Sequence, residues 1–495
     1  MQMYIFLLLP SLITGANILF LNTWQSKSHG RTMMYLAEEL VRRGHNVTMY
    51  SQVIAPIGAM GKGVTALESR LPAGVQFGDP AMVSKIFWFM EMSPLIFEDP
   101  HDISYQYLNA LKEDENLLRV LGTPYDLALL DEMFAPAQTA IALKLKETQG
   151  TKLGIFSTTD LFGYSSSHRS LSRNPVTFPS SYTKGHAAYD TLPERFYTRL
   201  FNSVDAFLEN IMFNWICNKY FVQAGAVLEV KSSLGSLYDN NLITFTDYPT
   251  RYGGAVPRSV DYISVSEHCE ESGPLKAGLK TFVEDPASKG TIYVAFGSIV
   301  NWQAGPPHVI ETFVNVFNRL SDYRVIWSYT GPELHNASST ILPLKWAPQN
   351  DILAHPKTVL FFTHGGLKSL REGICSNTPL LFLPFFADQA KNAAYAIQMH
   401  LAEAIYKGNI EEEALFKQMT KALKNPELKR SVSKYASHFT DNPMHTLELG
   451  AFWAEKVIRQ GSLPLARIRG RDLSWLDYFH IESLATISLL LYIIA

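Results

Sequence analysis

This chain of 495 residues is poor in cysteine and carries almost no excess charge. Its three cysteines, Cys217, Cys269 and Cys375, allow one disulfide at most, which excludes a disulfide-stapled scaffold and leaves the cellular compartment undecided. The formal net charge of −3 gives no electrostatic reason to expect nucleic acid as a partner. With 47% hydrophobic residues, the length predicts roughly two to four globular domains with some membrane character.

The sequence also lacks an apolar run of the ~20 residues that a membrane-spanning helix requires. Shorter apolar runs occur at both ends. The first, Tyr4 to Ile13, precedes the small residues Thr14 to Ala16, and this pattern predicts a signal peptide over 1–16. The second lies in the hydrophobic segment 478–495, which we interpret as a short candidate membrane anchor. We therefore expect entry into the secretory pathway and association with a membrane.

Two further patterns are missing. No G-x-G-x-x-G fingerprint follows a predicted strand, which argues against a dinucleotide-dependent oxidoreductase. No D-x-D pair ends a strand, and no His/Cys cluster has metal-ligand spacing. We therefore predict neither a required metal nor a cofactor.

What the sequence does contain is two α/β halves. Residues 17–255 begin with a predicted strand, a loop, an amphipathic helix and a second strand, with Gly44 closing the helix. Residues 256–278, where Pro, Gly and Ser accumulate, are predicted to be a linker. Residues 279–465 form a second series of strands and helices. This alternation predicts an α/β fold with a parallel sheet in each half.

The most informative stretch runs from 346 to 392. A buried strand over 359–362 leads into Thr363-His364-Gly365-Gly366 and then a helix, and such a junction offers unpaired backbone amides to a phosphate. A second strand, 380–385, ends in Asp388-Gln389. Ligands of open α/β sheets collect beyond such strand ends, so this stretch predicts a nucleotide site.

The order of residues in this stretch is similar to the signature of the UDP-glycosyltransferases, and most similar to the animal UDP-glucuronosyltransferase branch. The matching positions are Trp346, Gln349, Leu353, His355, the THGG at 363–366, Glu372, Pro379, Phe386, Asp388, Gln389 and Asn392. The resemblance implies the GT-B architecture, in which two Rossmann-like domains face one another. It also implies that the first half binds the acceptor, the second half binds the UDP-sugar, and the helix over 445–460 returns to the first half.

The resemblance assigns donor-binding roles residue by residue. Trp346 is expected to stack on uracil, beside the backbone of Ala347. Gln349 and Glu372 suit the ribose hydroxyls. The residues expected at the diphosphate are Gly297, Ser298, His364, Gly366 and Ser369, and those expected at the sugar are Asp388 and Gln389. Lys368 departs from the family, whose mammalian members commonly carry Asn at this position. Because a cation in the first turn of a helix is unfavourable unless an anion binds there, we predict that its ammonium points at the diphosphate, with a side chain extended into solvent as the alternative. Without the resemblance, core packing would be the preferred interpretation of Trp346 and a solvated helix face that of Glu372.

The resemblance also implies a catalytic pair. The His of Ser28-His29 matches the general base of the family, and Asp131 matches the carboxylate that orients it. Two alternatives stay open: Asp131 could instead cap the helix predicted after residue 135, and Glu132 is the spare carboxylate. The implied reaction is a single displacement with inversion at the anomeric carbon.

The sequence leaves the substrates open. Glucuronic acid is the donor sugar that the resemblance favours, with glucose as the alternative; a non-catalytic carrier of small lipophilic ligands is a third hypothesis. The aromatic and methionine-rich stretch 85–107 is interpreted either as core or as an acceptor cleft for apolar molecules. The endoplasmic reticulum membrane, with lumenal catalytic domains, is the expected location. Homo-oligomerisation stays open.

Overall fold

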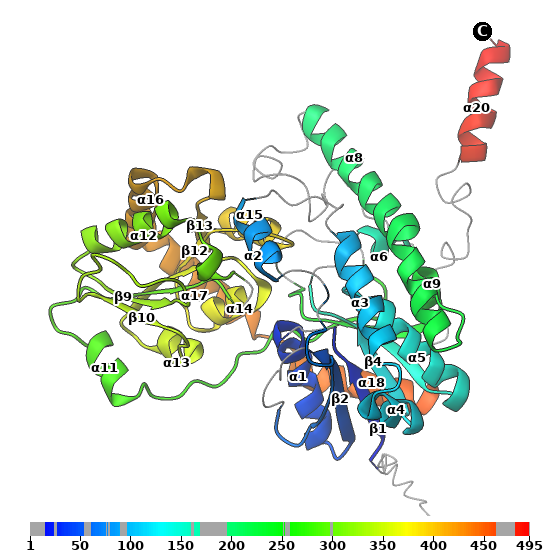
Figure 1. The fold of residues 1–495 in the computed structure, drawn as a ribbon. Coiled ribbons are helices and arrows are strands. Elements are labelled where there is room, and N and C mark those ends of the chain that lie inside the picture. Colours follow the sequence, from blue (N-terminus) through cyan, green and yellow to red (C-terminus); the bar gives the residue numbers. More distant parts are fainter. Residues whose placement is uncertain are drawn as a thin grey trace, which may run out of the picture.

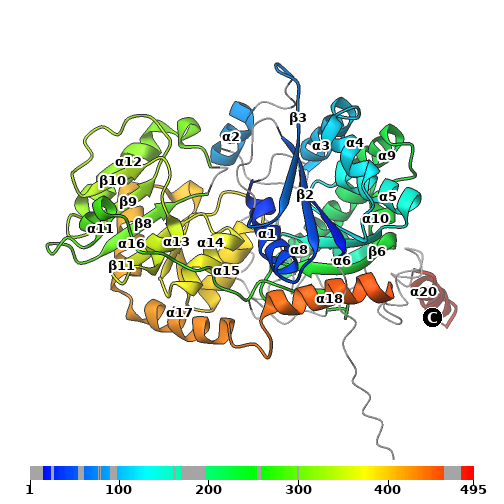
Figure 2. The same ribbon diagram turned by 90° about the horizontal axis from the view of Figure 1, so that it is seen from below.

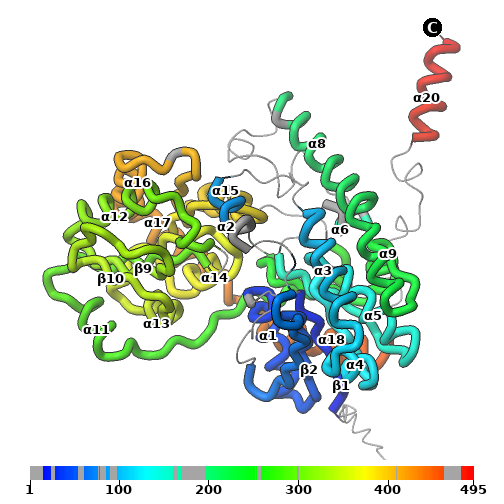
Figure 3. The backbone as a smooth tube through the Cα atoms, in the orientation of Figure 1, coloured from blue at the N-terminus to red at the C-terminus, as the bar shows by residue number. Residues whose placement is uncertain are grey.

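The computed structural model describes residues 15–461 and 481–494. Within the first range it leaves out 24–26, 54–60, 76, 78–79, 90–96, 160–162, 169–195, 251, 253–257 and 298–299. Two α/β domains lie side by side and are joined by an extended linker, as Figure 1 and the tube in Figure 3 show. This arrangement confirms the predicted GT-B fold.

The amino-terminal domain is built on a parallel sheet with the strand order β3-β2-β1-β4-β5-β6-β7. Its strands are β1 (Asn17–Leu21), β2 (Asn46–Val53), β3 (Thr65–Arg70), β4 (Leu127–Asp131), β5 (Lys152–Ser157), β6 (Asn241–Thr246) and β7 (Tyr262–Ser264). Its helices are α1 (Lys27–Arg42), α2 (Pro80–Phe89), α3 (Glu98–Ala110), α4 (Glu115–Gly122), α5 (Pro136–Gln149), α6 (Gly163–His168), α8 (Phe196–Ile211), the π-helix η2 (Met212–Cys217), α9 (Asn218–Val227) and α10 (Leu234–Asn240).

The central strands of this sheet are apolar on both faces because helices cover both. Ile18 and Phe20 of β1 pack in one cluster with α1, and Leu19 and Leu21 pack in another with α3, α5 and α9. All five residues of β4 are buried. A continuous apolar run is therefore the pattern of a strand covered on both faces, and its one polar member, Asp131, is the exception that needs a partner.

The carboxyl-terminal domain has a second parallel sheet with the order β10-β9-β8-β11-β12-β13. Its strands are β8 (Thr291–Ala295), β9 (Arg324–Ser328), β10 (Ile341–Leu344), β11 (Thr358–Thr363), β12 (Leu380–Phe382) and β13 (Ala402–Ala404). Its helices are α11 (Ala277–Val283), η3 (Trp302–Ala304), α12 (Pro307–Arg319), α13 (Gln349–Ala354), α14 (Leu367–Cys375), α15 (Gln389–Gln398), η4 (Lys407–Asn409), α16 (Glu412–Lys424) and α17 (Pro426–Phe439). One apolar cluster lies on each face of this sheet.

Two helices cross between the domains. After α17, helix α18 (Thr446–Gln460) runs back across the amino-terminal domain, where Ala451, Ala454 and Val457 join the cluster under α1 (Figure 2). This is the crossing that the family resemblance implied. In the opposite direction, Trp88 of α2 is buried in the core of the carboxyl-terminal domain.

The linker differs from its predicted limits. Strand β7 falls inside the predicted range 256–278 and pairs in parallel with β6, so the amino-terminal domain extends to Ser264. Beyond it, Cys269 forms a disulfide with Cys375 at the end of α14. The linker is therefore tied covalently to the helix that carries Glu372. Cys217 is buried and free.

The chain ends described by the structure carry two further facts. Ala16, inside the predicted signal peptide, is buried, and its amide donates to Nδ1 of His45. Helix α20 (Ile481–Ile494) lies inside the predicted hydrophobic segment. Among the described residues, no helix is both long enough and apolar enough to cross a membrane.

Candidate active site

The predicted base and its orienting carboxylate are in contact. His29 lies in the first turn of α1, which follows β1, and Asp131 is the last residue of β4. Because β1 and β4 are parallel neighbours, their carboxyl ends meet at one edge of the sheet. There Nδ1 of His29 lies 2.5 Å from Oδ2 of Asp131, whose side chain is fully buried. An ionised carboxylate can only accept, so Nδ1–H donates and Nε2 is left as the basic atom.

A third residue, Thr158, completes this group. Its hydroxyl donates to Oδ1 of Asp131 at 3.2 Å and lies 2.9 Å from Nδ1 of His29. The amide of Met133 donates to the same Oδ1 at 3.0 Å. Thr158 follows β5, the next strand after β4 in the sheet. We did not identify it from the sequence, although its place just after a strand neighbouring β4 was a signal that could have found it.

Both alternatives for the carboxylates are wrong. Helix α5 begins at Pro136, with Ala135 at its N-cap, so Asp131 does not cap it. Glu132 is buried, and it accepts hydrogen bonds from the hydroxyls of Ser165 and Tyr238, each at 2.9 Å. Glu132 thus holds α6 and α10 in place and does not contact His29.

The residues expected at uracil and ribose form a second group, in the other domain. The side chain of Trp346 is 73% exposed, so it is not a core residue, and its ring face is available for stacking. Gln349 begins α13, and its Nε2 donates to Oε2 of Glu372 on α14. The hydroxyl of Tyr293 donates to Oε1 of Gln349 at 3.1 Å. Burial raises the pKa of Glu372, and the charge of Lys368 opposes this shift.

The predicted diphosphate site is shaped by glycines around an imidazole. His364 follows β11, and burial lowers its pKa to about 4, so the ring is neutral at neutral pH. A methyl group on Gly366 would lie 2.5 Å from Nε2 of this ring, and one on Gly297 would lie 3.0 Å from its Cε1. Gly297 also has a φ of 72°, which disfavours other residues. Ser369 is buried in the first turn of α14. Ser298 lies outside the described residues.

The loop expected at the sugar is tied to this glycine pair. Oε1 of Gln389 accepts the amides of Phe385 and Phe386, at 2.8 Å and 3.1 Å. Asn392, one turn into α15, donates from Nδ2 to Oδ2 of Asp388 and to the carbonyl of Gly365, both at 3.0 Å. Asn392 therefore sets the distance between the diphosphate and sugar positions, a role that we did not assign from the sequence.

Lys368 has a different neighbour from the expected one. Its ammonium lies 3.5 Å from Oε1 of Glu270 in the linker and 5.5 Å from the ring centroid of Tyr35 on α1. Nδ2 of Asn350 donates to the other oxygen of Glu270 at 2.6 Å. Lys368 thus contributes to the junction between the domains, and its contact with diphosphate stays a prediction.

The aromatic stretch 85–107 contributes several core residues where it is described, although Phe89 is 65% exposed. The ring of Trp88 lies 5.1 Å from that of Trp302 and 4.9 Å from that of Phe385, so α2 packs directly behind the sugar loop. Phe97 and Tyr107 are buried in the amino-terminal domain. Residues 90–96 lie outside the described residues. The core interpretation therefore holds for the buried aromatics of this stretch.

Comparison with solved structures defines the class. The calicheamicin glycosyltransferase CalG4 matches 91% of this chain and all of its own, with a TM-score of 0.58 at 15% identity. A UDP-glucosyltransferase from Polygonum tinctorium matches 90% of this chain and 99% of its own, with a TM-score of 0.57 at 14% identity. These likenesses show the fold, which is that of the GT-B glycosyltransferases.

The sequence comparisons then show the family. Residues 108–495 match the family model described as UDP-glucoronosyl and UDP-glucosyl transferase, and the chain belongs to this family. UDP-glucuronosyltransferase 1A6 of Mus musculus is 29% identical over 65% of this chain and 59% of its own. UDP-glycosyltransferase UGT4 of Dactylopius coccus is 26% identical over 97% of this chain and 93% of its own. The chain thus belongs to the UDP-glycosyltransferase family and has the GT-B fold, and the predicted resemblance is confirmed.

Proposed function

We propose that this protein transfers glucuronic acid from a UDP-sugar to a hydroxyl group of a small lipophilic acceptor, with inversion at the anomeric carbon. The observation that supports this most directly is the contact between His29 and Asp131. It places the imidazole of the expected base against a fully buried carboxylate. The donor-binding residues of the family pattern face the same sheet edge of the second domain.

In the proposed reaction, Nε2 of His29 removes the proton of the acceptor hydroxyl. Asp131 stabilises the imidazolium that forms, and Thr158 keeps the carboxylate in place. The acceptor oxygen bonds to the anomeric carbon as the bond from that carbon to UDP breaks on the opposite face. The charge that develops on UDP is met by His364, Ser369 and the amides at the start of α14. We propose that no metal is required, because these hydrogen-bond donors stabilise the charge on the leaving diphosphate.

The donor sugar is the finer part of the proposal. The mouse relative is named a glucuronosyltransferase, while the family description includes glucosyl transfer as well. Spacing alone assigns no arginine or lysine to a sugar carboxylate. Glucose is therefore the alternative donor, with the same mechanism and the same residues.

The test uses the full chain with a panel of UDP-sugars, one phenolic acceptor and measurement of UDP release. We expect acceptor-dependent release that is fastest with UDP-glucuronic acid and unaffected by a metal chelator. His29→Ala should remove nearly all turnover and leave calorimetric UDP binding intact, since the base touches the acceptor. Binding of UDP without turnover for any sugar would favour the non-catalytic carrier. Turnover of His29→Ala within tenfold of wild type, about 1.4 kcal/mol in barrier, would refute the role of this residue.

We further propose that the chain enters the secretory pathway and works at the endoplasmic reticulum membrane with its catalytic domains in the lumen. The apolar segments at residues 4–13 and 484–495 support this. Asn336, in the sequence Asn336-Ala337-Ser338, is exposed and suits glycan attachment. A glycosidase-sensitive mass shift that Asn336→Gln abolishes would support lumenal exposure.

A further inference from the structure

Helix α8 is amphipathic in the reverse of the usual sense. Its polar side chains Asn202 and Glu209 are each 1% exposed, although a helix on the surface of a soluble domain normally turns such residues to water. The side chains of Phe201 and Phe207 are 63% and 64% exposed. Since water is a poor solvent for aromatic rings, this orientation indicates that the outward side of α8 meets something other than water.

The exposed apolar side chains lie on one side of α8, η2 and α9, densely along α8 and more sparsely beyond it, and we call this surface the outer face. It follows the three- to four-residue spacing of a helix along α8, passes through η2 and ends on α9. Its members are Phe196, Tyr197, Leu200, Phe201, Val204, Phe207, Leu208, Trp215 and Val222, each at least 43% exposed. Single exposed apolar residues are ordinary, but a group of this size on one side of a domain marks an interaction surface.

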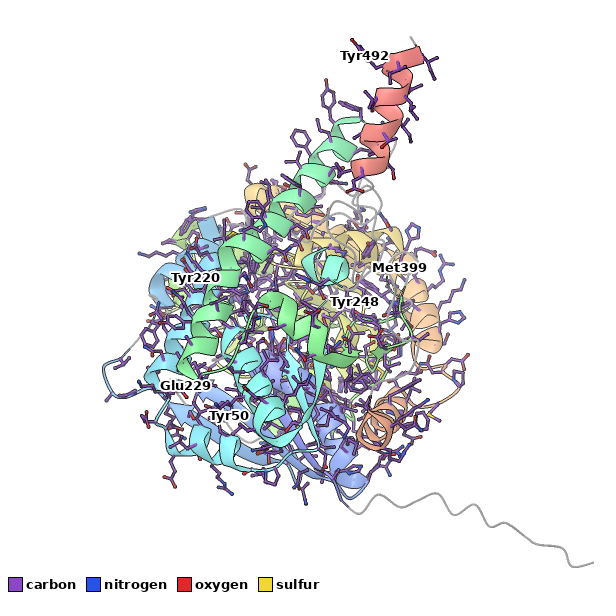
Figure 4. All side chains as sticks on the ribbon, turned by 90° about the vertical axis from the view of Figure 1, so that its right-hand side faces the viewer. Tyr50, Tyr220, Glu229, Tyr248, Met399 and Tyr492 are labelled. Carbon is purple, nitrogen blue, oxygen red and sulfur yellow. A yellow bond between two sulfur atoms is a disulfide. The ribbon has the colours of Figure 1, made fainter. Side chains whose placement is uncertain are left out.

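A second exposed apolar element lies on the same side of the molecule. None of the residues of α20 is buried, and its apolar side chains are up to 82% exposed. Figures 1 and 4 agree that α8 and α20 both project beyond the body of the protein in the same direction. A helix of 14 residues is about 21 Å long, which is shorter than the ~30 Å hydrocarbon core of a bilayer.

We propose that the outer face of α8, η2 and α9 rests on the surface of a lipid bilayer, next to the point where α20 enters it. Five of the nine side chains are aromatic, including Tyr197 and Trp215, and tyrosine and tryptophan favour the boundary between lipid and water. A planar, fluid partner can meet two separate projecting helices at once. The amino-terminal domain then lies against the membrane through its own surface, in addition to any anchor at the end of the chain.

The charge pattern identifies the kind of lipid contact. Charged residues on and beside the outer face are few and of both signs. Arg199 and Asp205 of α8 are half-buried, Glu209 is buried, and the neighbouring Lys219 lies 2.6 Å from Glu98. Binding should therefore come from apolar insertion and not from attraction to anionic head groups. It should be insensitive to salt and nearly independent of the anionic lipid content, which distinguishes it from a polybasic surface.

The test is flotation of the full chain with phosphatidylcholine vesicles. One variant replaces Phe201, Phe207 and Trp215 by Ser, and a matched control replaces Leu118, Val260 and Phe452, which are 41–65% exposed elsewhere on the surface. We expect the first variant to reduce partitioning at least tenfold and the control to match wild type. Raising the salt to 1 M should change neither. Thermal unfolding and UDP binding check that both variants fold, because the outer face lies in a different domain from the donor-binding residues.

Three results would overturn the proposal. Equal flotation of the outer-face variant and wild type would show that the outer face does not bind lipid. If both float, α20 holds the protein on the vesicles; if neither floats, the protein does not bind them. Loss of wild-type binding at high salt would show an electrostatic contact instead. If sedimentation shows that wild type is a dimer and the outer-face variant a monomer, with flotation unchanged, the face joins two copies of the chain. These outcomes are independent of the transfer reaction, because turnover is not the readout.

Discussion

Replacing Thr158 by Val should slow catalysis without weakening donor binding. Valine has nearly the same shape as threonine but cannot donate, so the substitution removes one hydrogen bond from Asp131 and leaves no cavity. Oδ1 of Asp131 keeps the amide of Met133 as its partner. In the wild type the Thr158 hydroxyl, 2.9 Å from Nδ1 of His29, limits rotation of the imidazole. The substitution removes this restraint. The change therefore acts on the orientation of the base.

The expected size follows from the contacts. A hydrogen bond to a charged group contributes about 1.5 to 3 kcal/mol. The distances from the Thr158 hydroxyl to the two carboxylate oxygens, 3.2 Å and 3.4 Å, are long, so the lower end of that range applies. A loss of about 1.5 kcal/mol in transition-state stabilisation corresponds to a kcat about tenfold lower. The donor KM should stay within about twofold, because Thr158 lies in the other domain from Trp346 and Glu372.

The assay is steady-state UDP release with the donor and the acceptor varied separately. Thr158→Ser, which keeps the hydroxyl, should restore most of kcat. Thr148→Val is the matched control, because that hydroxyl donates only to the carbonyl of Lys144 in its own helix and is exposed. The reasoning fails if Thr158→Val retains full kcat, or if Thr158→Ser is as slow as Thr158→Val. A fall in thermal stability with unchanged kcat would indicate a role in packing alone.

Three further predictions concern other parts of the molecule. Gly366→Ala should displace the His364 imidazole and raise the donor KM about tenfold, roughly 1.4 kcal/mol. The measurement is steady-state kinetics, with thermal unfolding of the variant as a check on its stability. An unchanged KM would show that this imidazole does not contact the donor. Burial holds the pKa of His101 at about 4, below its usual value near 6.5, so the unfolded chain binds the extra proton between these values. Stability should therefore fall as pH drops from about 6.5 to about 4, by about 1.4 kcal/mol per unit for this residue, and His101→Phe should flatten that slope in equilibrium unfolding. Trp88→Ala should destabilise the protein by about 3 to 5 kcal/mol in denaturant titration, whereas Trp215→Ala, on an exposed side chain, should cost about 0.5 kcal/mol or less; equal effects would contradict the burial that separates them.

The architecture and the donor site could be predicted from the sequence because their signals are local. Apolar runs alternating with amphipathic helices predict buried parallel strands, and β11 (Thr358–Thr363) lies close to the expected range 359–362. The donor residues on α13, α14 and α15 come from one stretch of fewer than 50 residues. Its strand-to-helix junctions predict a nucleotide site, and the family resemblance supplies the expected role of each residue. Trp346 shows the limit, since its exposure was needed to exclude core packing.

Strand order decided what local patterns could not. The sequence left Asp131 open between a helix cap and the partner of His29, and the pairing of β1 with β4 settled it by bringing residues 102 positions apart into contact. The same order placed Thr158 beside them and put β7 in the first sheet. Likewise, only folding showed that Cys269 pairs with Cys375, and that α8 turns its apolar side outward. Periodicity identifies which side of a helix is apolar, but what that side faces depends on how distant segments pack around it.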